Sequence, residues 1–280
     1  IGVRLVGSEM CIRDRYRQQG QSTWINISNP TTNSTTVTGL TAGITYEFRV
    51  AADNGLLGAY SATTPADIFD VLSLNPIAWL SSTNITNGGT EPLHDDKVAA
   101  WSDLTGTATD ATESTVANQP TYKTNVQNGL PAIYFDGTHN RGLQGTFERT
   151  NNGGLTIFLV GSFSGTARRA FFEFYSVAGN SRGFFFTYGY NASSSQGLDN
   201  TQFNVWSAYD TGTNSSLWEN GVNKYTSMNN YAGFPSTAFT GSGAYVLGDD
   251  QTGGDRLNGY LGEFLVFDKQ RTASEMATIE

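Results

Sequence analysis

Carboxylate side chains are the first candidates for chemistry in this sequence, because two of them at a fixed separation can cleave a glycosidic bond. Retaining glycosidases place two carboxyl groups about 5 to 5.5 Å apart. Residues i and i+2 of a strand share a face, so Glu-x-Asp-x-Glu or a close variant is the expected spacing. Glu173 and Glu219 have no carboxylate two or four positions away, and Asp268 lies five residues after Glu263, on the opposite face of an extended strand. The spacing therefore disfavours glycoside hydrolysis by this chain.

Calcium binding is the next candidate, because Ca²⁺ prefers hard oxygen ligands from carboxylates and loop carbonyls. Asp249, Asp250 and Asp255 fall in the loop DDQTGGD before the final expected strand, and Asp136 closes another loop. Their spacing does not match the twelve-residue EF-hand pattern. A calcium site at the first three residues and a solvated loop without metal are both compatible with the pattern.

Aromatic side chains could form a sugar-binding platform, since the apolar faces of sugars stack on rings while side-chain amides bind the hydroxyls. Trp206, Tyr209 and Trp218 fall on neighbouring expected strands beside several asparagines. Tyr188 and Tyr190 alternate along another expected strand, before the polar loop NASSSQG. We take these five as candidate ligand-binding residues. Burial in the core is the alternative for each ring, because large aromatics also dominate protein interiors.

Composition narrows the class of protein that must position these residues. The chain has 280 residues, 32 glycines, 15% charged residues and a net charge of −9. A surface of Ser, Thr, Asn and Gly is typical of extracellular β-proteins and excludes long amphipathic helices of Ala, Glu, Lys and Leu. An acidic chain without a basic stripe is a poor nucleic-acid binder, and no apolar run is long enough to insert into a membrane. Cys11 is the only cysteine, so a disulfide framework is excluded.

The expected elements are almost all short strands separated by Gly, Asn and Asp turns. Asn220-Gly221 predicts a tight hairpin, and Thr272 with Glu275 predicts a capping box before a short C-terminal helix. The pattern predicts a large antiparallel sandwich or barrel after residue 74. Its clearest strands are at 132–135, 155–163, 170–175, 183–190, 203–209, 216–219, 244–247 and 259–267.

The first part of the chain divides into three segments. Residues 1–15 (IGVRLVGSEMCIRDR) differ in style from the rest and look like translated sequencing-adapter read-through, so we expect them to be non-native. The segment 35–61 (TTVTGLTAGITYEFRVAADNGLLGAYS) resembles the second half of a fibronectin type III domain. The resemblance implies that the Tyr46 hydroxyl bonds back to the chain near Leu40. We assign 16–65 to a partial domain of this type, with its first two strands cut off upstream, and 66–74 to a linker.

Six stretches of the second part occur in the order found in one superfamily. They are PIAWLSS (76–82), VAAWSDLTG (98–106), NQPTYKTNVQNGLPAIYFDG (118–137), LTIFLVGSF (155–163), LWENG (217–221), and YVLGDD (245–250) with NGYLGEFLVFDKQRTASEMATIE (258–280). In this order they resemble the concanavalin A-like superfamily, in particular bacterial laminin-G-like domains. The resemblance implies that 75–280 is an all-β, two-sheet jelly-roll sandwich that binds glycans or other extracellular polymers.

These observations lead to one expectation and two alternatives. We expect a secreted or cell-surface protein that acts as a non-catalytic carbohydrate-binding or adhesion module. One alternative is a structural spacer of a large surface protein, in which the aromatic rings are all buried. The other is an accessory module of a polysaccharide-active enzyme whose catalytic domain lies outside this sequence. The fold by itself does not fix a ligand.

Overall fold

The computed structural model describes most of the chain in two compact units, 1–74 and 75–280, which are treated separately below. The described residues are 11–27, 37–53, 57–87, 89–138, 142–150, 154–164, 170–176, 182–187, 202–210, 215–225, 241–250 and 253–280. Within these ranges almost all regular structure is antiparallel strand, with one short α-helix. The expectation of an all-β antiparallel protein is confirmed at this level.

The first unit contains a four-stranded antiparallel sheet in the order β2-β1-β3-β4. Its strands are β1 (Cys11–Gln18), β2 (Ile25–Asn26), β3 (Thr45–Asp53) and β4 (Thr64–Asp67). β1 pairs with β3 along its whole length, from Cys11 opposite Asp53 to Gln18 opposite Tyr46. The boundary that we expected between residues 15 and 16 therefore falls inside a strand. The read-through origin of 1–15 stays a prediction.

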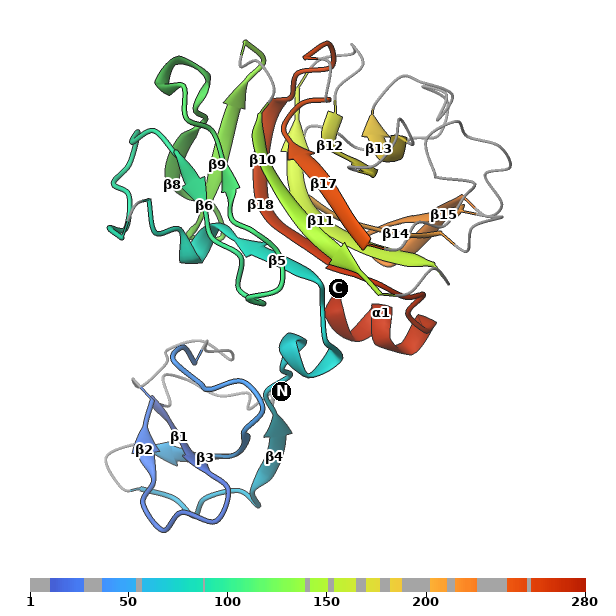
Figure 1. The fold of residues 1–280 in the computed structure, drawn as a ribbon. Coiled ribbons are helices and arrows are strands. Elements are labelled where there is room, and N and C mark those ends of the chain that lie inside the picture. The colour runs from blue at the N-terminus through green and yellow to red at the C-terminus, as the bar shows by residue number, and fades with distance from the viewer. Residues whose placement is uncertain are drawn as a thin grey trace. The chain divides into compact units, whose positions relative to one another are not determined.

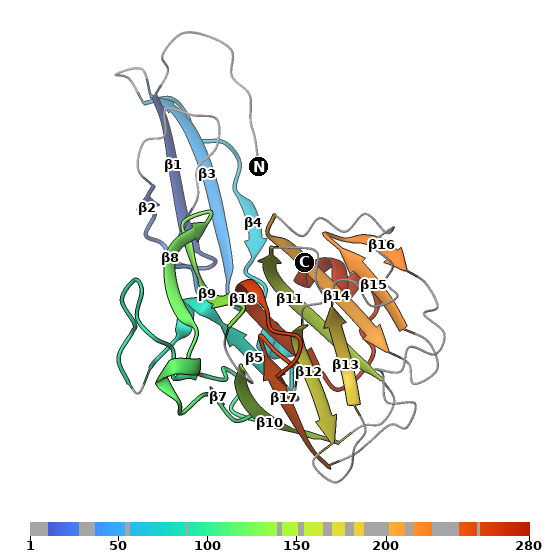
Figure 2. The same ribbon diagram turned by 90° about the horizontal axis from the view of Figure 1, so that it is seen from above.

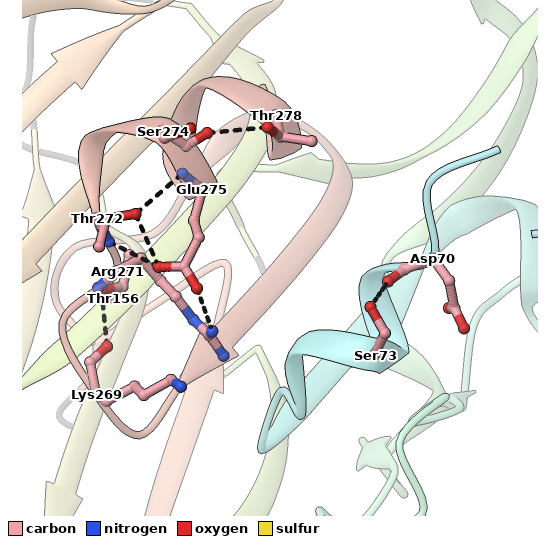
Figure 3. Close-up of polar contacts among 9 residues, drawn as sticks. All are labelled: Asp70, Ser73, Thr156, Lys269, Arg271, Thr272, Ser274, Glu275 and Thr278. Carbon is pink, nitrogen blue, oxygen red and sulfur yellow. Dashed lines mark hydrogen bonds and ion pairs between the residues drawn. The ribbon is translucent and has the colours of Figure 1, made fainter. Parts of the chain in front are cut away.

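Tyr46 fixes the loop that enters β3. Its side chain is buried, and its hydroxyl accepts a hydrogen bond of 3.2 Å from the backbone N–H of Thr41. This is the bond back to the chain beside Leu40 that the sequence predicted. A 3₁₀ helix, η1 (Val71–Leu74), follows β4. The backbone carbonyl of Asp70, the residue before η1, accepts a hydrogen bond of 2.6 Å from the Ser73 hydroxyl (Figure 3).

The second unit consists of two antiparallel sheets (Figures 1 and 2). The six-stranded sheet has the order β13-β12-β17-β10-β7-β6, and the eight-stranded sheet has the order β16-β15-β14-β11-β18-β9-β8, with β5 also paired to β18. The strands of the six-stranded sheet are β6 (Ala100–Trp101), β7 (Ala111–Thr112), β10 (Leu143–Arg149), β12 (Ala170–Ser176), β13 (Arg182–Thr187) and β17 (Gly241–Leu247). Those of the eight-stranded sheet are β5 (Ala78–Ser81), β8 (Thr121–Gln127), β9 (Leu130–Asp136), β11 (Leu155–Phe163), β14 (Asn204–Asp210), β15 (Ser215–Glu219), β16 (Val222–Tyr225) and β18 (Asn258–Phe267).

One hydrophobic core lies between the two sheets of this unit. It takes side chains from both of them, and rings touch across the interface: Phe172 lies 5.2 Å from Phe264 and Phe171 lies 5.0 Å from Trp206, between ring centroids. Phe171 and Phe174 are both buried there. The packing of aromatic rings supplies much of the apolar area that holds the sheets together.

Local signals fix the ends of several elements. Asn220 and Gly221 both have positive φ, 50° and 72°, and close the β15–β16 hairpin as predicted. The helix α1 (Ala273–Ile279) begins with the predicted capping box between Thr272 and Glu275 (Figure 3). Two further 3₁₀ helices, η2 (Ser82–Asn84) and η3 (Val116–Asn118), lie in connections. No helix in the described ranges has the length and apolar character needed to cross a membrane.

Candidate functional site

The outer face of the eight-stranded sheet carries the aromatic side chains that could meet a ligand. On β14 the even positions Trp206 and Ala208 join the core, and Leu217 does the same on β15. Because side chains alternate along a strand, Tyr209 and Trp218 point away from the core. Both are partly exposed. The candidate site is therefore built on the outer face of two neighbouring strands, β14 and β15 (Figure 2).

Tyr209 and Trp218 are in contact across β14 and β15. Their ring centroids are 5.1 Å apart with an interplanar angle of 34°. Each ring lies opposite a serine in the ladder, Tyr209 opposite Ser216 and Trp218 opposite Ser207. These two small side chains leave room for the rings to approach each other diagonally, as long cross-strand side chains do. The structure thus brings together two of the five aromatic residues proposed from the sequence.

Polar groups flank this pair. On the edge strand β16, Asn223 lies directly opposite Trp218 and is exposed. On the other side of Trp218, the Ser207 hydroxyl contacts the Glu280 carboxylate. Ser207 is buried, so Asn223 is the group of these that is placed to meet a ligand. Aromatic rings with an exposed amide beside them match the chemistry of a sugar, which has apolar faces and a rim of hydroxyls.

Trp206 does not belong to this group, which corrects the sequence expectation. Its side chain is 2% exposed and packs against Phe171 and Phe163 in the core. The indole N–H donates to Glu219 Oε1 at 3.2 Å, and Lys224 Nζ lies 3.0 Å from the other oxygen of that carboxylate. Trp206 and Tyr209 are three positions apart on one strand, so they cannot share a face.

Tyr188 and Tyr190 lie outside the described residues. The same holds for the side chains of β13.

The proposed calcium loop is organised by its own hydrogen bonds. Asp249, Asp250 and Asp255 are all buried. Asp250 Oδ1 accepts the backbone N–H of Gly254 at 2.6 Å and that of Asp255 at 3.3 Å. Among the residues that the structure describes, no group of three or more His, Cys, Asp or Glu side chains is arranged to hold a metal ion. The Asp250 carboxylate thus binds backbone N–H groups of its own turn. Calcium binding at Asp249, Asp250 and Asp255 stays a prediction.

A second aromatic group on the same face was missed by the sequence analysis. Tyr134 and Tyr260 have ring centroids 4.9 Å apart, and Phe203 lies 5.8 Å from Tyr260. All three are partly exposed. They come from β9, from β18 and from the residue before β14. No local signal in the sequence links these three positions, which lie far apart in the chain.

Charged groups beside this second group form an ion pair. Lys123 on β8 contacts the Asp95 carboxylate and lies 5.9 Å from the centre of the Tyr134 ring. The hydrogen bond from Lys123 lowers the pKa of Asp95 below its ordinary value, and the same bond raises the pKa of Lys123. Both side chains therefore stay charged at neutral pH.

The carboxylates considered for catalysis have separate structural partners. Glu263 Oε1 accepts the indole N–H of Trp79 at 2.7 Å, and burial raises the pKa of Glu263. Asp268 accepts a bond of 2.7 Å from Arg149 Nε. Each carboxylate is thus tied to a different strand.

Comparison with known proteins gives a distant structural likeness only. No protein-family model matches the sequence, and no curated protein matches it either. Domain 4 of AbnA, an extracellular arabinanase of Geobacillus stearothermophilus solved with arabinotriose, is 13% identical with a TM-score of 0.46, over 73% of this chain and 97% of that one. Trypanosoma rangeli sialidase, solved with sialic acid, is 10% identical with a TM-score of 0.49, over 84% of this chain and 42% of that one.

A third similar structure is botulinum neurotoxin type C, whose cell entry depends on two ganglioside molecules. It is 10% identical with a TM-score of 0.43, over 75% of this chain and 52% of that one.

Proposed function

We propose that this chain is a non-catalytic carbohydrate-binding or adhesion module of an extracellular protein, and that it binds glycan at Tyr209 and Trp218. The observation that carries the proposal is the contact between these two partly exposed rings on the outer face of the sheet, with Asn223 directly opposite Trp218. Stacking on such rings needs no reactive group. The surface rich in uncharged polar residues supports the extracellular location.

The finer fold assignment belongs to the same proposal. We infer that 75–280 is a concanavalin A-like jelly roll of the laminin-G-like type and that 16–65 is part of a fibronectin type III domain. Two stacked antiparallel sheets with a shared core support the first assignment, and the bond from Thr41 to the Tyr46 hydroxyl supports the second.

The structural-spacer alternative is favoured by one observation, the complete burial of Trp206. A spacer would bury its large rings, whereas Tyr209 and Trp218 keep part of their surface in solvent. In the other alternative the chain is an accessory module of a polysaccharide-active enzyme. It would bind glycan at the same site, and only the parent protein, with a catalytic domain outside this sequence, would differ.

A glycan array, probed with the full chain with and without calcium, tests the proposal. Trp218→Ala and Tyr209→Ala should each weaken the binding of the best glycan by about tenfold or more, which corresponds to about 1.4 kcal/mol. Asn223→Ala should weaken it less, because an exposed hydrogen bond contributes little net energy. Phe69→Ala is the matched control, since Phe69 is an exposed ring of the first unit. Absence of binding to any glycan, or binding that both ring variants retain, would refute the proposal.

A further inference from the structure

We propose that Tyr134, Tyr260 and Phe203 form a second binding site, which takes a single neutral, linear glycan chain lying across the strands. The inference goes beyond the Tyr209–Trp218 site and rests on the proposed function only in assuming that the module meets glycans. The two groups are distinct places on the sheet. Phe203 and Tyr209 are six residues apart along one extended segment, so their backbones are separated by about 20 Å.

The three rings form one continuous row across four strands. Tyr134 is the register partner of Tyr260, and Ser162 of β11 lies opposite Tyr260 on its other side. Phe203 precedes β14, which is the next strand along. Because Ser162 is small and buried, the rings of Tyr260 and Phe203 approach to 5.8 Å above it. The three partly exposed rings therefore form a continuous row that runs across the strands.

Neighbouring rings of the row are tilted against each other. The interplanar angle is 40° between Tyr134 and Tyr260 and 41° between Tyr260 and Phe203. Coplanar rings would fit the flat face of a crystalline polysaccharide. A row whose rings are each tilted against the next fits a free chain, whose successive sugar units also rotate about the chain axis. The geometry thus favours one dissolved chain over a solid surface.

Polar groups along the row match the hydroxyls of a sugar. The Tyr134 hydroxyl donates to Asn258 Oδ1 at 3.4 Å, a long bond at the open side of the row. Asn258 is partly exposed and lies on the same strand as Tyr260. The amide and the tyrosine hydroxyls can exchange such weak contacts for bonds to a ligand, because side-chain amides and hydroxyls both donate and accept.

The local charges indicate a neutral occupant. The cation at the end of the row, Lys123, is already paired with Asp95. Asp136 is exposed and is the register partner of Asn258. At this site an anionic glycan chain would lie near two carboxylates, those of Asp95 and Asp136, and one ammonium group, that of Lys123. The net charge of the protein is −9. Like-charge repulsion therefore disfavours uronic-acid or sulfated polymers.

Calorimetry with the full chain tests this site. The probes are linear cello-, xylo-, manno- and arabino-oligosaccharides from disaccharide to hexasaccharide, with polygalacturonate and crystalline cellulose as the acidic and planar comparisons. Affinity for one neutral series should rise with chain length as the ligand covers successive rings. Tyr260→Ala and Tyr134→Ala should each lower the affinity by about tenfold, and Tyr260→Phe should retain most of it because the ring remains. A thermal melt of each variant identifies any that has unfolded.

The outcomes separate this site from the first one. Binding that is lost in Tyr260→Ala and Tyr134→Ala but kept in Trp218→Ala supports the second site. This conclusion does not depend on whether the Tyr209–Trp218 site binds glycan. Binding lost only in Trp218→Ala overturns the second site while the proposed function stands. The second site is also overturned if no neutral oligosaccharide series binds, or if polygalacturonate or crystalline cellulose binds more tightly. A dimer seen by light scattering that dissociates in Tyr260→Ala would overturn it too.

Discussion

The indole N–H of Trp79 donates a 2.7 Å hydrogen bond to Glu263 Oε1, which joins β5 to β18 on the outer face of the large sheet. Burial raises the pKa of Glu263 above its ordinary value of 4.5, and the bond from Trp79 lowers it only in part. The folded protein thus holds a proton on this carboxyl more tightly than the unfolded chain does. The resulting stabilisation is fully present below pH 4.5 and is lost as the pH rises through the folded-state pKa.

Glu263→Gln should therefore increase the free energy of unfolding at neutral pH, because glutamine keeps the acceptor for Trp79 without the buried charge. The difference from the parent protein should shrink near about pH 4.5, where the parent's carboxyl is protonated. Urea unfolding at both pH values measures it. Glu263→Leu is the control: it leaves the indole N–H without its acceptor and should cost about 1–3 kcal/mol relative to the glutamine variant. A glutamine variant less stable than the parent at neutral pH would contradict the assignment.

A buried ion pair ties the two sheets of the second unit together. Arg149 of β10 and Asp268, just after β18, have side chains only 4% and 8% exposed, and their Nε–Oδ1 distance is 2.7 Å. The second carboxylate oxygen accepts the backbone N–H of Thr150 at 2.7 Å. Asp268→Ala leaves the buried Arg149 guanidinium without this carboxylate, so it should lower the free energy of unfolding by about 3–5 kcal/mol.

The double variant Arg149→Met with Asp268→Leu is the matched test of this pair. Replacing both charges by apolar groups of similar size removes the uncompensated charge, so the double variant should be more stable than Asp268→Ala alone. Chemical denaturation of the parent protein, Asp268→Ala and the double variant gives the differences in the free energy of unfolding. A cost below about 1 kcal/mol for Asp268→Ala would instead indicate a solvent-screened pair.

Features that depend on neighbouring residues were predictable from the sequence. The strand expected at 155–163 has the same bounds as β11, and the Asn220-Gly221 hairpin and the Thr272 capping box form as predicted. Such features depend on backbone preferences over a few residues. Two polar strands, β8 and β10, were missed. In β10, Gly145 looks like a strand breaker, yet it faces Tyr245, whose hydroxyl would lie 2.3 Å from any added Cβ.

The candidate sites were predicted less well, for two different reasons. The misplacement of Trp206 could have been avoided, since strand alternation alone separates it from Tyr209. Tyr260 could not be placed in this way. Leu261 and Phe264 both enter the core although they are three positions apart, because the ladder between β11 and β18 shifts at Gly262. Strict alternation from Phe264 would have buried Tyr260, and a bulge of this kind has no reliable sequence signal.

The capping box of α1 can be tested by a single substitution. Thr272 Oγ1 accepts the backbone N–H of Glu275 at 3.2 Å, and Glu275 Oε2 accepts the backbone N–H of Thr272 at 2.8 Å. Thr272→Ala should lower the free energy of unfolding by about 1 kcal/mol. Ser274→Ala, at an exposed position in the same helical turn, should be neutral or slightly stabilising because alanine favours helix. Equal effects of the two changes on thermal unfolding would show that the capping box contributes nothing.

Substitutions at two glycines, one at the start of β17 and one just after its end, can measure the cost of a strained backbone apart from the cost of a steric clash. Gly241 and Gly248 both have positive φ, 95° and 81°. A Cβ on Gly241 would meet no atom of the described residues within 4 Å, whereas a Cβ on Gly248 would lie 2.1 Å from the ring of Phe135, in the core. Gly241→Ala should therefore cost only the left-handed strain, about 1–2 kcal/mol.

Gly248→Ala should cost clearly more, about 2–5 kcal/mol, because the buried ring must also move. The backbone N–H of Gly248 donates to Phe171 O at 2.7 Å and its carbonyl accepts from Leu257 N–H at 2.9 Å, so the residue cannot shift without breaking these bonds. Urea unfolding of the two variants under one set of conditions gives the difference directly. Equal losses would mean that Phe135 can yield without cost, and the close packing inferred at this corner of the core would then be wrong.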